Sequence, residues 1–147
     1  MSVEAIMSKK LTVTSPDASL ASLRAVFTDA HYQHVPVVDS MQRVVGIVSV
    51  KDFYKALSPV VDSASEQTAE LFAQGRKVRT IMTCPVVCIA PDTPVLSAAA
   101  LLVERNISCL LVTSPQHKLL GIVSWKDIMR LIVQRQQAKR RQQEEEE

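Results

Sequence analysis

The sequence predicts an α/β (α+β) fold made of two tandem repeats, each ordered strand-helix-strand-strand-helix and packed about a pseudo-twofold axis. The first observation is a seven-residue stretch, Gly46 to Asp52, that returns at Gly121 to Asp127 with six of its seven residues kept. The second is an offset of 75 residues that holds without a gap from Ile6 to Asp52, with 13 of 47 positions identical. Internal repetition of this kind indicates duplicated structural units.

Each repeat begins with a short apolar stretch, a Pro-Asp turn and an amphipathic helix. Strands are predicted over Leu11 to Ser15 and over Val86 to Ala90. Helical spacing with one buried stripe follows, through apolar residues at positions 20, 23, 26 and 27 and again at 95, 98, 101 and 102. Thr93 and Pro94 are the expected N-cap and N1 residues of the second helix.

Two runs of β-branched and apolar residues, separated by a polar turn, then predict a hairpin in each repeat. The runs are Val35 to Val38 with Arg43 to Val48, and Leu110 to Thr113 with Lys118 to Val123. A last helix in each repeat is expected to follow the hairpin directly.

The repeated stretch is a strand-to-helix junction, because Ser-x-x-Asp after a buried strand is typical of an N-cap with an acid three residues later. The two copies are Ser49 with Asp52 and Ser124 with Asp127. Free backbone N–H groups at such a junction attract anions, and an exposed carboxylate accepts hydrogen bonds from paired hydroxyls. Phosphate with a diol describes a nucleotide. The alternative is a capping box that binds no ligand.

The domain organisation follows from these elements. We expect repeat 1 over residues 1–62, a connecting helix over 63–77, repeat 2 over 78–133 and a helical, charged tail over 134–147. A capping box from Ser63 to Glu66 is expected to open the connecting helix, with Gly75 as its stop. The last four residues, Glu144 to Glu147, are expected to fray.

Composition excludes several classes of function. The chain has 47% hydrophobic and 22% charged residues and a net charge of +2, so no broad cationic face for nucleic acid is expected. No apolar run reaches the roughly 18 to 20 residues that span a bilayer, and no signal-peptide pattern is present, so we expect no membrane contact and a cytoplasmic location. Three cysteines without a C-x-x-C pair are expected to stay reduced. No catalytic constellation and no metal cluster are present, so we expect no enzyme activity.

With these motifs assembled, the sequence resembles a cystathionine-β-synthase (CBS) domain pair, also called a Bateman module. The resemblance covers nearly the whole chain. It rests on matched motifs in both copies: Ile6-Met7, Pro16-Asp17, His34 to Asp39 and Gly46 to Asp52; then Ile81-Met82, Pro91-Asp92, Asn106 to Val112 and Gly121 to Asp127. Leu111 departs from the family pattern, which often has the proline seen at Pro36.

The resemblance implies a non-catalytic, stand-alone regulatory module that binds AMP, ADP, ATP or S-adenosylmethionine in clefts between the repeats. Asp52 and Asp127 would hold the ribose hydroxyls, and Ser49 and Ser124 would lie near phosphate. The remaining ligand-binding residues implied for the Asp127 cleft are Ile122, Leu11, Thr12, Ser108 and Cys109. Those implied for the Asp52 cleft are Ile47, Val86, Val87, Gln33 and His34. The matching family position implies that His34 approaches phosphate.

A different class of function stays open beside the sensor. In this alternative the module is a dimerisation or interaction scaffold whose clefts bind no ligand. Under either hypothesis we expect a homodimer, formed through helices as the resemblance implies, and an effector protein that the sequence does not identify. His31 and His34 have a metal-like spacing, yet a solvated histidine at a helix end is the favoured interpretation. Lys139 to Arg141 are interpreted as solvated or paired with the glutamates behind them.

Overall fold

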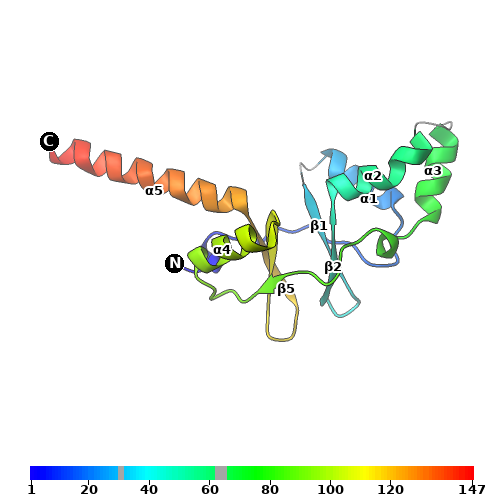
Figure 1. Cartoon of the computed structure of the whole chain (residues 1–147), viewed down its shortest axis with the longest axis horizontal. Helices are drawn as coiled ribbons and strands as arrows, with labels where there is room; N and C mark the ends of the chain where they lie inside the picture. The colour runs from blue at the N-terminus through cyan, green and yellow to red at the C-terminus, as the bar shows by residue number, and fades with distance from the viewer. Residues whose placement is uncertain (30–31, 62–65) are drawn as a thin grey trace. The chain divides into compact units, whose positions relative to one another are not determined.

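The computed structural model describes residues 1–29, 32–61 and 66–147, which divide into two compact units (Figure 1). Unit 1 contains Met1–Leu11, Val87–Pro115 and Leu120–Glu147, and unit 2 contains Thr12–Val86 and Gln116–Leu119. The units therefore cut across the sequence repeats, because the opening residues of each repeat group with the other repeat.

Unit 2 consists of helices packed on a hairpin. Its elements are α1 (Ala21–Asp29), β1 (His34–Val38), β2 (Val44–Ser49), α2 (Val50–Val61), α3 (Glu66–Gly75) and the 3-10 turn η2 (Val78–Thr80). Strands β1 and β2 pair antiparallel, with Val35 opposite Val48. The hairpin predicted from the β-branched runs is confirmed.

The strand predicted over Leu11 to Ser15 is wrong in extent, because only Thr14 forms strand-like bonds. Thr14 makes a parallel bridge to Val37: its N–H donates to the Pro36 carbonyl at 3.0 Å, and its carbonyl accepts from Val38 N–H at 2.9 Å. The chain then turns at Pro16, which has no N–H to continue a ladder.

Unit 1 repeats this architecture with a fuller sheet. Its elements are η1 (Val3–Ala5), β3 (Cys88–Ile89), α4 (Val95–Arg105), β4 (Cys109–Thr113), β5 (Leu119–Ser124) and α5 (Trp125–Glu146). The strands are ordered β3-β4-β5, and β3 runs parallel to β4 with Ile89 opposite Val112. This pair stands 75 residues after Thr14 and Val37. The predicted strand Val86 to Ala90 shortens to two residues.

Helix ends differ from expectation at three places. Helix α4 begins at Val95, with Pro94 as the N-cap and no side-chain cap bond, so the predicted Thr93 cap is wrong. Helix α3 ends at Gly75, where its stop was expected, but this glycine has no positive φ, so the stop is not a left-handed cap. The expected capping box at Ser63 involves residues outside the described part of the chain. Helix α5 continues to Glu146, where fraying was expected (Figure 1).

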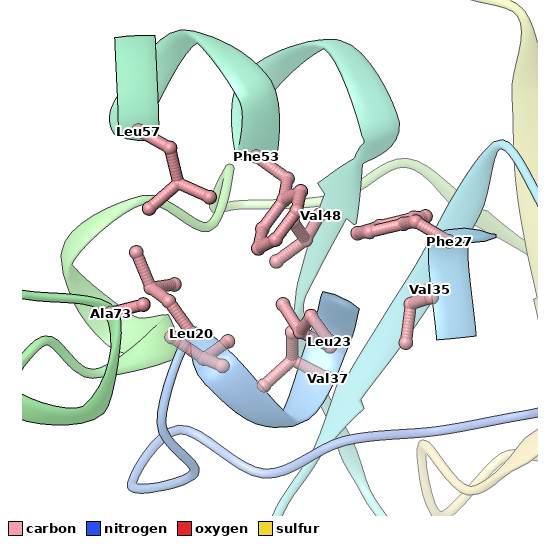
Figure 2. Close-up of a cluster of buried hydrophobic side chains, with 10 residues drawn as sticks. Leu20, Leu23, Phe27, Val35, Val37, Val48, Phe53, Leu57 and Ala73 are labelled. Atoms are coloured by element: carbon pink, nitrogen blue, oxygen red, sulfur yellow. The ribbon is translucent and has the colours of Figure 1, made fainter. Parts of the chain in front are cut away.

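Each unit has its own hydrophobic core, and the two cores use matched positions. In unit 2, Figure 2 shows Phe53 and Leu57 of α2 facing residues of α1 and β1, with Ala73 of α3 beside them. Seven positions recur at the offset of 75: Leu20, Leu23, Phe27, Val35, Val37, Val48 and Phe53 in unit 2; Val95, Ala98, Leu102, Leu110, Val112, Val123 and Ile128 in unit 1. The rings of Phe27 and Phe53 lie 5.3 Å apart, a contact for which unit 1 has the aliphatic pair Leu102 and Ile128.

The opening segment of each repeat completes the sheet region of the other repeat's hairpin. In unit 1, Ser8 and Ile122 exchange two backbone hydrogen bonds, of 2.9 and 3.1 Å. In unit 2, Ile47 and Thr83 do the same, at 3.1 and 2.8 Å. In each unit, the segment that follows the Ile-Met motif of one repeat therefore contacts the Gly-Ile motif of the other repeat.

Candidate functional site

The junction between β5 and α5 in unit 1 is a closed capping box. Ser124 is the N-cap, and its hydroxyl accepts the N–H of Asp127 at 3.3 Å. The Asp127 carboxylate in turn accepts from Ser124 N–H at 2.8 Å and from the Ser124 hydroxyl at 3.1 Å, both through Oδ2. The predicted N-cap with an acid three residues later is confirmed here.

Asp127 makes a further contact that the sequence motif does not include. The guanidinium of Arg130, one turn along α5, donates to Asp127 Oδ1 at 3.3 Å and forms an ion pair with it. The Arg130 side chain is 59% exposed, whereas that of Asp127 is 11% exposed. The signal was the i, i+3 spacing of an acid and a base on a helix.

The corresponding junction in unit 2, between β2 and α2, is only half closed. Ser49 accepts the N–H of Asp52 at 3.0 Å through its hydroxyl. Within residues 1–29, 32–61 and 66–147, no hydrogen bond or ion pair reaches the Asp52 carboxylate. Lys55 occupies the position that matches Arg130, and the described residues contain no ion pair between Lys55 and Asp52.

His34 stands beside this half-open junction. It is the first residue of β1, directly opposite Ser49 in the hairpin register, and the preceding Gln33 carbonyl accepts the N–H of Val50 at 2.8 Å. Burial lowers the pKa of His34 from its ordinary value of 6.5, and the negative charge of Asp52 acts in the opposite direction. At neutral pH the imidazole is therefore uncharged.

Unit 1 has Ser108 and Cys109 at the positions of Gln33 and His34. The Ser108 carbonyl accepts the N–H of Trp125 at 3.1 Å, which reproduces the backbone geometry of unit 2. Burial raises the pKa of the Cys109 thiol to about 12, so this side chain carries no charge at neutral pH. Cys84, Cys88 and Cys109 are all free.

The other predicted ligand-binding residues divide between the two units. Unit 1 holds Leu11, Val87, Ser108, Cys109, Ile122, Ser124 and Asp127; unit 2 holds Thr12, Gln33, His34, Ile47, Ser49, Asp52 and Val86. Both isoleucines of the proposed adenine slots, Ile47 and Ile122, are half-buried and are bonded to the opening segment of the other repeat. The structure thus brings together, in each unit, one Ser-x-x-Asp junction, one isoleucine and the two residues at the start of the hairpin. These two residues, here called the hairpin entry, are Gln33 and His34 in unit 2 and Ser108 and Cys109 in unit 1.

An apolar groove lies away from the junction, on the helices of unit 1. It encloses about 220 Å³. Its lining residues are Met1, Pro94, Val95, Leu96, Ile128, Leu131, Ile132 and Arg135. Leu96 is 83% exposed and Ile132 is 55% exposed beside it, so this face of α4 and α5 has no covering element within the described chain.

The described residues offer no metal site and no membrane-spanning helix. No group of three or more His, Cys, Asp or Glu side chains gathers there in a way that suits a metal ion. His31, one of the two histidines with metal-like spacing, lies outside the described residues. None of the described helices combines the length and apolar character that crossing a membrane requires.

The fold and the paired junctions define a class of protein with two intertwined α/β repeats, each ending in a Ser-x-x-Asp strand-to-helix junction. The family model of the CBS domain matches residues 3–62 and 78–134. The chain belongs to the CBS domain family, and the expected CBS pair is confirmed.

Two curated relatives match most of this chain. Homoserine O-acetyltransferase of Methanococcoides burtonii is 30% identical over 131 residues, which are 89% of this chain and 24% of that protein. A CBS domain-containing protein of Dictyostelium discoideum is 29% identical over 134 residues, 90% of this chain and 91% of that protein. The chain therefore spans only about a quarter of the length of the acetyltransferase.

Solved structures agree with this assignment. The CBS domain pair of protein MJ0100, in complex with 5'-methylthioadenosine and S-adenosyl-L-methionine, has a TM-score of 0.74 and 26% identity, and the match covers 92% of this chain and 98% of that one. CBSX2 in complex with AMP has a TM-score of 0.76 and 26% identity, with the same coverage.

Proposed function

We propose that this chain is a regulatory module that binds an adenosine nucleotide, such as AMP, ADP, ATP or S-adenosylmethionine, at its Ser-x-x-Asp junctions and signals the binding to a partner protein. The observation that carries the proposal is the half-open junction of unit 2. A carboxylate without a hydrogen-bonding partner among the described residues stands there at the N-terminus of a helix, next to a histidine. This arrangement suits a diol and a phosphate together.

The comparisons support the chemical class of the ligand. Two CBS pairs of similar fold, both 26% identical to this chain, hold adenosine compounds: 5'-methylthioadenosine with S-adenosyl-L-methionine in one, and AMP in the other. Transferred by matching position, Asp52 and Asp127 take ribose hydroxyls, and Ser49 and Ser124 stand on the phosphate side. Ile47 and Ile122 contact adenine.

The module acts through differential binding and performs no chemical step. A ligand shifts a conformational equilibrium only by as much as it prefers one state over the other, and a coupling of about 1–3 kcal/mol is typical of such regulation. The partner that reads this change is an effector protein.

Calorimetry of AMP and ATP binding to the parent chain, Asp52→Ala and Asp127→Ala tests the diol assignment. We expect saturable binding to the parent and weaker binding to at least one variant. Two variants that both bind like the parent would show that neither carboxylate holds the ribose. A thermal-shift screen that includes S-adenosylmethionine would identify the preferred ligand, since selective binding to the folded state raises Tm.

The apolar groove on α4 and α5 favours a second candidate function, that of a dimerisation scaffold. Exposed Leu96 and Ile132 line this groove, and a second copy of the chain presents the same apolar surface to it, as a twofold interface requires. Light scattering of the parent and of Leu96→Glu tests this function. If both the parent and Leu96→Glu are monomers, a homodimer through this face is excluded. A parent that is dimeric but binds no nucleotide would favour the scaffold.

A further inference from the structure

The two Ser-x-x-Asp junctions, alike in sequence, differ in how many acceptor positions their carboxylates have left. A carboxylate offers about four lone-pair positions. Those of Asp127 receive three hydrogen bonds from the chain itself: two from Ser124, at 2.8 and 3.1 Å, and one from Arg130 at 3.3 Å. The Asp52 carboxylate receives none from the described residues.

One of these three hydrogen bonds follows from a substitution between the repeats, and a second substitution changes the surroundings of the carboxylate. At the position three residues after the acid, unit 1 has Arg130 and unit 2 has Lys55. Arginine has five N–H donors in a planar fork that suits a carboxylate, whereas lysine is a compact, strongly hydrated point charge. At the hairpin entry, unit 2 has the ionisable His34, and unit 1 has Cys109, whose thiol is neutral.

We propose that the junction of unit 2 is the nucleotide site of highest affinity, and that Arg130 restricts the junction of unit 1 by occupying the carboxylate that a ribose would need. This inference rests on the proposed function, because it decides between two junctions that the sequence treats as equal. Arg130 is a positioning residue here: it acts on Asp127 and needs no contact with the ligand.

The restriction is adjustable, because the ion pair is partly exposed. Arg130 is 59% exposed, and pairs of this kind are weakened by salt and add little to folding stability. A nucleotide therefore competes with Arg130 at higher concentration. One chain would respond in two steps, first at unit 2 and then at unit 1, over separate concentration ranges.

Calorimetry with AMP on the full chain tests the order of the two junctions. We expect Asp52→Asn to weaken the first binding event at least 10-fold, and Asp127→Asn to weaken it less than 3-fold. The same titrations with 2',3'-dideoxy-AMP report the diol directly: the parent discriminates against this analogue, and Asp52→Asn does so much less. Equal losses from the two Asn variants, or a larger loss from Asp127→Asn, would overturn the proposal.

Arg130→Gln tests the restriction itself, with Lys55→Gln as the matched control on the other repeat. We expect Arg130→Gln to strengthen the second event about 10-fold and to reduce its dependence on salt, while Lys55→Gln leaves the second event unchanged. A second event that is equally weak in both variants would remove Arg130 from this role. Absence of binding to AMP, ADP, ATP and S-adenosylmethionine alike by the parent is a separate result, which would reject the proposed function itself.

Discussion

Met7 lies directly against Gly121, so closely that a Cβ atom added to the glycine would stand 2.5 Å from the Met7 sulfur and 3.0 Å from the Ser8 carbonyl oxygen. The same relationship joins Met82 to Gly46, at 2.7 Å from the sulfur. The glycine of each junction is therefore required by the chain segment that crosses it, and not by a left-handed backbone, since no glycine has a positive φ.

Gly121→Ala is expected to destabilise the protein by about 1–3 kcal/mol, the usual effect of overpacking. The methionine side chain can move, but the Ser8 backbone cannot without losing its bonds to Ile122. Urea unfolding measures the change. Gly75→Ala is the control: nothing lies within 4 Å of its Cβ position, so this variant should be neutral or more stable by about 0.4–1 kcal/mol. Equal effects from the two substitutions would contradict this account of the glycine.

Val3 is expected to stabilise the core of the repeat that is far from it in sequence. It is fully buried among α4, β4 and β5 side chains. Val3→Ala should cost about 1–3 kcal/mol in the free energy of unfolding, whereas Val13→Ala, at a side chain that is 40% exposed, should cost less than about 0.5 kcal/mol. Amide exchange should show the loss in β4 and β5. A loss of amide protection confined to unit 2 would argue against packing of the Val3 segment in unit 1.

His34 should make stability depend on pH in a defined direction. Burial holds its pKa below the ordinary 6.5, so the unfolded chain takes up the proton before the folded chain does. The stabilising contribution is therefore complete above pH 6.5 and is lost as pH falls through the lower, folded pKa. Unfolding of the parent and of His34→Gln between pH 5 and 8 should diverge only in the acid part of this range. Parallel profiles would mean that the imidazole titrates alike in both states.

Nucleotide affinity should depend on the same proton with the opposite sign. A protonated His34 attracts the phosphate, so affinity for AMP should increase as pH is lowered through the histidine's pKa. Titrations at matched ionic strength would measure this trend, and His34→Gln should flatten it. A parent profile that is already flat between pH 5.5 and 8 would place the phosphate away from His34.

Much of the fold could be predicted from sequence because each structural signal occurs in both repeats. The hairpins, both junctions and the paired core positions follow from β-branched runs, capping signatures and an unbroken offset. The strand at Leu11 to Ser15 could not be predicted correctly, because a short apolar stretch does not show that only Thr14 finds a ladder partner. The offset of 75 residues alone also cannot show that the first residues of one copy pack with the other copy, although the family resemblance implied this by placing Leu11 and Thr12 in the Asp127 cleft.

The difference between the two junctions is likewise hidden in the sequence motif. Ser-x-x-Asp is identical in both, yet Ser124 donates to its acid and Ser49 does not. The residues three positions after the acid, Arg130 and Lys55, are both basic and both lie outside the motif. Only the hydrogen-bond geometry separates a committed carboxylate from an available one.

The crossing of the opening segments has a consequence for how such a protein can evolve. Val3 of the first repeat is buried in the core of unit 1, and Val78 of the second repeat is buried in the core of unit 2. A single repeat would therefore lack part of its own core if it were duplicated, deleted or fused elsewhere alone. Gene fusion or recombination that preserves both cores must transfer the two repeats together, so the evolutionary unit is the pair of repeats.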